Sequence, residues 1–181
     1  MSVKGLFKHI ALVINHKNKV LYHCAKCGLL WRGLVHDMSK FSPTELFESS
    51  KYYCGDHSPI EVCRQENGVS NAWLHHKGRN RHHIEYWMDY DLPEHPPMPY
   101  KFAVECVCDK LAATKTYNGK NYTPDKAIAH WRKVGGRVES NPKNKLFIET
   151  VLTDIAQQGE DFVLNKGYMR KTYDRIYNQE K

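Results

Sequence analysis

Apolar residues recur at three- and four-residue intervals along most of this chain of 181 residues. That interval places apolar side chains on one face of an α-helix, whereas strict alternation would indicate a β-strand. The clearest run predicts a helix over residues 6–26, with apolar positions Ile10, Val13, Ile14, Val20 and Leu21. Gly28 can end this helix, because glycine readily adopts the left-handed conformation that follows a helix. A second helix is expected over residues 29–38.

Helix-start signals divide the middle of the chain. Residues 42–45, Ser-Pro-Thr-Glu, combine a capping serine, a proline in the first turn and a glutamate three residues after the cap. This combination predicts a helix that runs to about residue 53. Residues 55–68 are expected to form a loop, Ser70 to cap a short helix, and residues 81–90 to form another helix.

Prolines at positions 93, 96, 97 and 99 predict an extended connector, because proline cannot donate a helical hydrogen bond. Three more helices are expected to begin near Pro99, Thr123 and Asn141, the last ending at Gly159. Short capped helices joined by short loops pack as bundles. The sequence therefore predicts an all-α bundle of about six to eight helices, with one domain over residues 1–159 and a helical tail over residues 160–181.

Composition narrows the class of protein. Hydrophobic residues make up 41% of the chain, which argues against disorder. The net charge of +7 favours an anionic partner such as a nucleotide, a phosphate ester or a nucleic acid. The basic residues are scattered, so a solvated basic surface explains them equally well. No apolar run is long enough to cross a membrane, and the first residues lack a signal-peptide pattern, so a cytoplasmic location is expected.

Six cysteines are expected to be reduced thiols in such a compartment. Cys24 and Cys27 have the two-residue gap of a zinc or redox pair, but no second pair has this gap. We therefore expect the cysteines to serve as small buried apolar side chains.

Histidines are the main chemical signal, because nine of the eleven precede Pro93. Neutral imidazole is the commonest protein ligand for metal ions. His9, His16 and His23 are seven residues apart on one helical face, so neighbours lie roughly 10 Å apart along the axis and cannot share one ion. His16, at the edge of the apolar stripe, is the best inward candidate. His9 and His23 are interpreted as surface or hydrogen-bonded core histidines.

The His36-Asp37 pair follows the apolar residues Leu34 and Val35, so it should lie near the core. A buried carboxylate is costly unless it is paired or binds a metal ion. Lys40 could bind a phosphate oxygen or neutralise Asp37; a simple ion pair near a helix end is the alternative.

Two histidine pairs, His75-His76 and His82-His83, flank a break at residues 77–80 and could place several imidazoles at one point. Within the break, Arg79 and Asn80 are candidates for binding a substrate. The alternative is a basic loop of exposed histidines. Asp109 lies in an apolar run, so an inward Asp109 carboxylate would need a cation, which a metal ion at His36-Asp37 would supply. Otherwise it faces outward and pairs with Lys110.

The order of His16, His36-Asp37, a histidine cluster and Asp109 resembles that of the HD superfamily of all-α metal-dependent phosphohydrolases. Residues 36–40, His-Asp-Met-Ser-Lys, are similar to the His-Asp-x-Gly-Lys of its two-metal phosphodiesterases, with Ser39 in place of glycine. Residues 72–83, Ala-Trp-Leu-His-His-Lys-Gly-Arg-Asn-Arg-His-His, together with residues 36–43, resemble a narrower group, the uncharacterised bacterial and phage proteins of DUF5662. That resemblance covers roughly residues 10–155.

The HD resemblance implies an HD-domain-like bundle that binds one or two divalent ions (Mn, Fe, Mg, Ni or Zn). It implies a phosphohydrolase or phosphodiesterase acting on a nucleotide or cyclic nucleotide in a bacterial or phage-infected cytosol. The expected metal ligands are His16, His36, Asp37 and Asp109 for the first ion, with His75 and His82 for a second. Lys40, His76 and His83 are expected to bind phosphate or transfer protons. An HD-type di-iron oxygenase, and a basic helical module that binds nucleic acid or a partner around a structural metal, remain the alternatives.

Overall fold

The computed structural model describes residues 3–55 and 57–178. Ten α-helices and four short 3₁₀ helices, with no β-strand, make up the regular structure of this part of the chain, so the predicted all-α bundle is confirmed. The α-helices are α1 (Val3–Lys26), α2 (Leu30–Val35), α3 (Pro43–Lys51), α4 (Pro59–Asn67), α5 (Asn71–Arg79), α6 (Tyr100–Asn118), α7 (Asp125–Val134), α8 (Pro142–Gln158), α9 (Glu160–Val163) and α10 (Lys166–Tyr177). The 3₁₀ helices are η1 (Met38–Phe41), η2 (Ile84–Trp87), η3 (Gly119–Asn121) and η4 (Gly135–Arg137).

Three predicted helix starts, at Ser42, Ser70 and Asn141, are confirmed by their caps. The Ser42 hydroxyl accepts a hydrogen bond from the Glu45 amide at the start of α3, and Ser70 does the same for Trp73 at the start of α5. Side-chain oxygens at these positions satisfy amides that have no partner within the helix. Gly28, with a φ of +74°, follows the end of α1 as expected.

The prediction of a loop over residues 55–68 was wrong, because α4 occupies its second half. Ser58 and Pro59 repeat the serine–proline start seen at α3, and Pro59 and Cys63 are buried on one helical face. The predicted helix over residues 81–90 was also wrong, since only the 3₁₀ turn η2 forms there. The predicted helix over residues 29–38 is shorter and ends at Val35.

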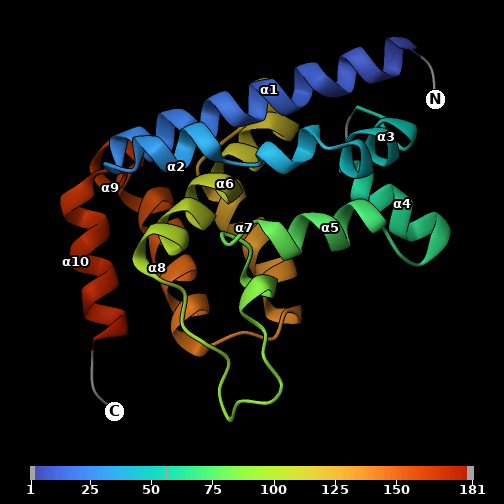
Figure 1. The fold of residues 1–181 in the computed structure, drawn as a ribbon. Helices are drawn as coiled ribbons and strands as arrows, with labels where there is room; N and C mark the ends of the chain where they lie inside the picture. Colours follow the sequence, from blue (N-terminus) through green and yellow to red (C-terminus); the bar gives the residue numbers. More distant parts are fainter. Residues whose placement is uncertain (1–2, 56, 179–181) are drawn as a thin grey trace.

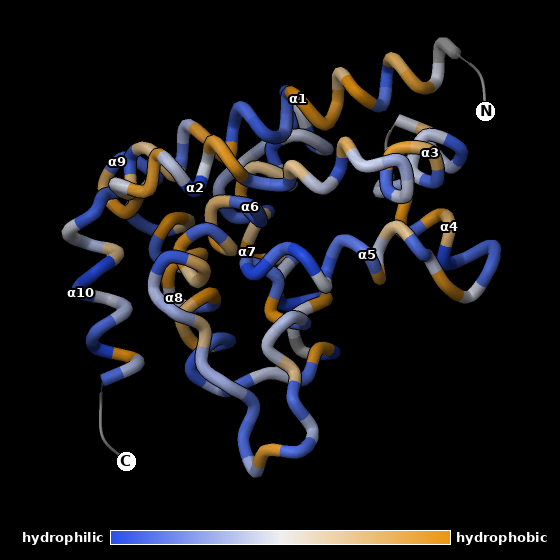
Figure 2. The backbone as a smooth tube through the Cα atoms, in the orientation of Figure 1, coloured by the Kyte–Doolittle hydropathy of each residue, from blue (hydrophilic) through white to orange (hydrophobic). Residues whose placement is uncertain are grey.

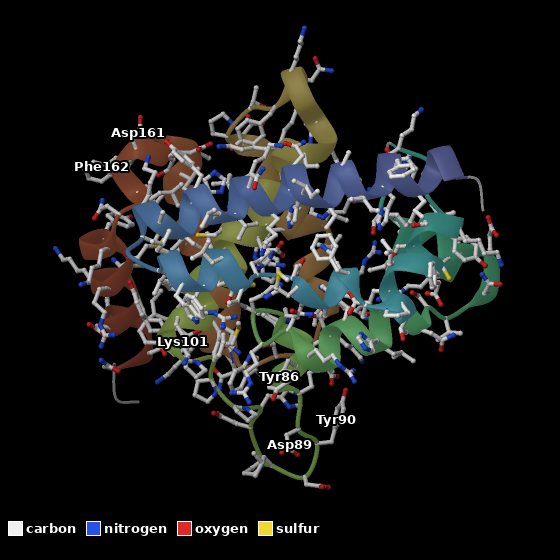
Figure 3. The ribbon with its side chains drawn as sticks, turned by 45° about the horizontal axis from the view of Figure 1, so that its top comes forward. Tyr86, Asp89, Tyr90, Lys101, Asp161 and Phe162 are labelled. Atoms are coloured by element: carbon white, nitrogen blue, oxygen red, sulfur yellow. The ribbon has the colours of Figure 1, made fainter. Side chains whose placement is uncertain are left out.

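The long α1 lies across the top of the molecule, with α2 beside it and α6, α7 and α8 beneath (Figure 1). On one side α3, α4 and α5 form a smaller group, and α10 closes the opposite side. The connector between η2 and α6 projects away from the helices and carries Asp89 and Tyr90 (Figure 3). The helices therefore surround α6 on several sides.

The core is built around α6 and α8. Ten of the 19 residues of α6 are buried, so this helix is covered nearly all round. Apolar positions along α6 and α8 are visible on the backbone in Figure 2. The last two helices join the same core through Val163, Leu164, Met169 and Ile176. In the part of the chain described, no helix is long and apolar enough to span a membrane.

Candidate metal centre

The His36-Asp37 pair lies in the sharp break between α2 and η1. His36 is extended (φ −54°, ψ 130°) and Asp37 is left-handed (φ 52°, ψ 29°). Among the described residues, Asp37 is the single non-glycine residue with a positive φ, a conformation that costs about 1 kcal/mol or more. The break turns two consecutive side chains into the interior, which consecutive positions of a regular helix could not do.

Lys17, on α1, holds this break in place. Its ammonium donates hydrogen bonds to the carbonyls of Leu34 at 2.5 Å and of His36 at 2.8 Å. The last carbonyls of a helix have no partner within it, and a cation there also interacts favourably with the helix dipole. Lys17 therefore fixes the backbone that carries the central carboxylate.

One group of possible metal ligands consists of His16, His36, Asp37 and Asp109 and is named the two-aspartate site. His16 Nε2, from the middle of α1, lies 3.0 Å from Asp109 Oδ1 on α6. His36 Nε2 lies 3.4 Å from the same oxygen and 3.3 Å from Asp37 Oδ2. Three separate segments thus bring four ligand atoms to one point.

A second group consists of Asp37, His76, His82 and His83 and is named the three-histidine site. His76 Nε2, at the end of α5, lies 3.3 Å from Asp37 Oδ1. His82 Nε2, in the irregular segment after α5, lies 3.4 Å from that oxygen. The rings of His82 and His83 are adjacent, with centroids 4.3 Å apart.

Asp37 belongs to both groups, and its two oxygens are divided between them. Oδ2 faces His36, whereas Oδ1 faces His76 and His82. A carboxylate with this orientation can bridge two metal ions. Among the described residues, Asp37 is the one member that the two groups share.

Glu105, one helical turn before Asp109, supports the histidines from behind. Its Oε1 accepts a hydrogen bond from His36 Nδ1 at 3.0 Å and lies 3.4 Å from His82 Nδ1. Its Oε2 accepts hydrogen bonds from Arg32 at 2.7 Å. A carboxylate on Nδ1 fixes the ring and leaves the Nε2 lone pair for a metal ion.

Glu45 has the corresponding role on the other side. Its Oε2 accepts from His76 Nδ1 and its Oε1 from His75 Nδ1, each at 2.7 Å. Asn80 donates hydrogen bonds to the Ser39 hydroxyl at 2.7 Å and to the His76 carbonyl at 2.8 Å, which links η1 to the end of α5. The hydrogen bond to Glu45 fixes the orientation of the His76 ring, and the Asn80 contacts hold the backbone that carries it.

The spacing of these atoms fits divalent metal ions. Ligands about 2.1 Å from one ion lie roughly 3.0 to 3.4 Å from each other at octahedral or tetrahedral angles. The short contacts above cover the same range. Several of the atoms are buried, and no group in the described ranges hydrogen bonds to them: His36 Nε2, His82 Nε2, His83 Nε2 and Asp37 Oδ1. Buried polar atoms without partners are costly, so a cation that binds them accounts for the arrangement.

The electrostatics also suit a cation. Burial lowers the pKa of His16 and His83 below the usual value of 6.5, so both rings are neutral and keep a lone pair. At His36 the carboxylates of Asp37, Asp109 and Glu105 outweigh burial and raise the pKa well above 6.5, so this ring holds a proton that a bound metal ion would displace. Burial alone would raise the pKa of Asp37 and Asp109. His36 and Lys40 outweigh it at Asp37, and His16 and His36 do so at Asp109, so both pKa values lie well below the usual range.

The two groups form the floor of a cavity of about 600 Å³. Asp37, Asp109 and three of the histidines face it, as does Lys40. The walls come from α1, α3, α4, α5, α6 and α7, and include Leu12, Ile60, Tyr117, Lys126 and His130. The candidate ligands are thus within reach of a small molecule that enters the cavity.

The structure brings together most of the predicted site residues: His16, His36, Asp37, Lys40, His76, His82, His83 and Asp109. His75, predicted as a ligand, lies outside both groups and contacts Glu45 instead. Arg79 is exposed and does not line the cavity, whereas Asn80 is taken up by bonds within the protein. His9 lines the cavity, and His23 lies away from it, beside Lys115. Cys24 and Cys27 are buried free thiols.

Four contributing residues were not expected from the sequence: Lys17, Arg32, Glu45 and Glu105. The sequence around Glu45 signals the start of α3 and nothing about the histidines. The position of Glu105 could have been predicted, because it lies four residues before Asp109 on the same face of a helix whose other buried residues are mostly apolar.

The fold and the site together define an all-α protein with a buried histidine–carboxylate centre, suited to divalent cations, at the floor of a cavity. The chain belongs to a family of unknown function, DUF5662, which matches residues 5–154. Searches of curated proteins and of solved structures gave no match.

Proposed function

We propose that this protein is a two-metal phosphohydrolase that cleaves a nucleotide, a cyclic nucleotide or a related phosphate ester. The observation that carries the proposal is the position of Asp37. Its two oxygens face two groups of ligands on the floor of an open cavity, with Lys40 beside them.

The ligand atoms of the two-aspartate and three-histidine sites would hold divalent ions next to the cavity. Ions bound there would polarise a phosphoryl oxygen and lower the pKa of a bound water. Glu105 and Glu45 keep the Nδ1 atoms of His36 and His76 protonated, so that their Nε2 atoms point inward. Lys40, from η1, reaches the same floor and can bind an oxygen of the phosphate.

The cavity supports a small anionic substrate. Two lysines, Lys40 and Lys126, line it, and the protein as a whole carries a net charge of +7. Apolar side chains such as Leu12, Ile60 and Ala129 offer a surface for the uncharged part of a nucleotide. A cavity of this kind suits a single nucleotide better than a nucleic-acid duplex.

The order of ligands along the chain adds to the proposal, because it resembles that of the HD superfamily, whose members include phosphohydrolases. We place the activity in the cytoplasm of a bacterium or of a phage-infected cell, where the free cysteines would stay reduced.

An HD-type di-iron oxygenase is the second candidate. The three-histidine site favours it, since imidazole ligands suit iron. Lys40 and the basic charge favour phosphate chemistry instead, because an oxygenase does not require an anionic substrate.

A phosphate-release assay separates the two candidates. Protein loaded with Mn, Fe, Mg or Ni would be incubated without oxygen with nucleoside mono-, di- and triphosphates and cyclic nucleotides. We expect phosphate or ester cleavage that is lost in Asp109→Asn and retained in Glu149→Gln, a matched change in an exposed ion pair on α8. Oxygen consumption by the iron-loaded protein, with no cleavage under any condition, would replace the proposal with the oxygenase.

A further inference from the structure

Lys40 contacts one oxygen of the Asp37 carboxylate, whereas histidines contact the other. Its Nζ lies 2.6 Å from Asp37 Oδ2. That oxygen is the one that faces His36 and the two-aspartate site, at 3.3 Å from His36 Nε2. Oδ1, which faces the three-histidine site, contacts His76 and His82. The ammonium therefore lies where an ion in the two-aspartate site would bind Asp37.

The charges around the centre leave room for one divalent ion beside Lys40. Four carboxylates, from Asp37, Glu45, Glu105 and Asp109, are offset by three cationic side chains, Lys17, Arg32 and Lys40. With the histidine ligands neutral, as metal binding requires, one divalent ion leaves one positive charge in excess and a second ion leaves three. The second ion would lie next to an ammonium, and like charges a few ångströms apart in a protein repel each other.

Lys40 is also able to move. Its side chain lines the cavity and is 26% exposed, and a lysine ammonium is carried on a flexible four-carbon stem. Arg32, in contrast, is fixed by two contacts to Glu105. The cavity lies directly beside Lys40, so its ammonium can turn toward a bound phosphate.

We propose that the Lys40 ammonium holds the place of the second metal ion. The protein binds one divalent ion tightly in the three-histidine site. It takes a second in the two-aspartate site when Lys40 withdraws from Asp37 into the cavity, where it meets the anionic substrate. This inference rests on the two-metal site of the proposed function.

The test is a titration of metal-free protein with Mn²⁺ alone, followed by calorimetry and by the electron paramagnetic resonance of coupled Mn²⁺ pairs. In the unaltered protein we expect one tight ion and a second that binds at least about tenfold more weakly. Lys40→Met removes the charge at similar length, so the second ion should bind about tenfold more tightly or better, and the pair signal should appear at lower Mn²⁺. Lys40→Gln should give the same result.

Two controls separate charge from structure. Lys40→Arg keeps the charge and should leave the second ion weak. Lys126→Met removes a lysine from the cavity wall, where it bonds to the Asn121 carbonyl and touches none of the candidate metal ligands, so it should bind the two Mn²⁺ ions as the unaltered protein does. Thermal unfolding of each variant verifies that it is folded.

The outcomes distinguish the inference from the function on which it rests. Two ions of equal affinity in the unaltered protein, unchanged by Lys40→Met and Lys40→Gln, would overturn the role of Lys40 and leave the two-metal site intact. Absence of Mn²⁺ binding in every variant would remove both.

Discussion

At the scale of single residues, the centre depends on side chains whose orientations are set by other side chains. Asp37 is held in an unfavourable backbone conformation, and its carboxylate is shared by two groups of histidines. Glu105 and Glu45 orient the imidazoles, and Arg32 in turn holds Glu105. A change to one of these supporting residues should therefore weaken metal binding, although the residue itself binds no metal ion.

Glu105→Gln tests this dependence. The amide cannot accept from His36 and Arg32 as strongly as the carboxylate does, so the His36 ring loses its fixed orientation. Loss of such a supporting group lowers metal affinity by about 10- to 100-fold, which competition with a chelator of known affinity would measure. Glu149→Gln, on the surface of α8, should change nothing. Equal affinity in the two variants would show that Glu105 does not support the site.

His23 gives a prediction about acid stability away from the centre. Burial, and then the charge of Lys115, lower its pKa from 6.5 to about 4. Between these values the unfolded chain binds a proton that the folded protein does not, so stability falls as the pH drops from 6.5 toward 4. The loss contributed by this residue is at most about 3 kcal/mol.

Urea unfolding at pH 7 and pH 4.5 measures this loss. His23→Gln should reduce the difference between the two pH values, whereas His95→Gln, at a half-buried position on the connector, serves as the comparison. A pH difference that is identical in the His23→Gln variant and the unaltered protein would contradict the assignment.

At the scale of elements, the centre is assembled from helix ends and from two helix interiors. α1 and α6 supply His16 and Asp109 from within, whereas the break between α2 and η1, the end of α5 and the segment between α5 and η2 supply the rest. Interrupted helices allow His36 and Asp37, or His82 and His83, to approach one point together. Lys17 links a helix interior to a helix end, since its side chain reaches from the middle of α1 to the carbonyls at the end of α2.

Lys17→Met should lower the free energy of unfolding by about 1 to 2 kcal/mol, because two carbonyls lose a charged donor. It should also weaken metal binding, since the break that carries Asp37 is no longer held. Lys19→Met is the matched control: Lys19 also lies on α1 but bonds to Asn15 on its own helix. Urea unfolding and chelator competition measure the two effects, and a Lys17 variant that matches the Lys19 variant in both would exclude the positioning role.

The sequence predicted the helices with strong caps and failed where the signal was short. The serine–proline start of α3 predicts its helix, and a similar pair, Ser58 and Pro59, begins α4 within the segment predicted to be a loop. His76 rather than His75 points inward because it shares a face with the buried Ala72, four residues earlier. The contacts of Glu45 and Glu105 join distant parts of the chain, and local patterns contain no information about them.

At the scale of the whole molecule, the smaller group of α3, α4 and α5 lies to one side of α1 and α6 (Figure 1). Residues of all five helices line the cavity at the centre. The family match ends at residue 154, yet Val163, Met169 and Ile176 beyond it lie in the same core as α6 and α8. The last helices therefore support the helix that carries Glu105 and Asp109. The whole chain should be used in every measurement.

Metal content by mass spectrometry, on unaltered protein and on Asp37→Ala, tests the central claim most directly. Both would be purified without a histidine tag and reconstituted with divalent metal. We predict about one tightly held ion per chain in the unaltered protein and a near-complete loss in Asp37→Ala, because Asp37 belongs to both sites. Unaltered protein that holds no metal after reconstitution, or an Asp37→Ala variant that holds as much as the unaltered protein, would contradict the account.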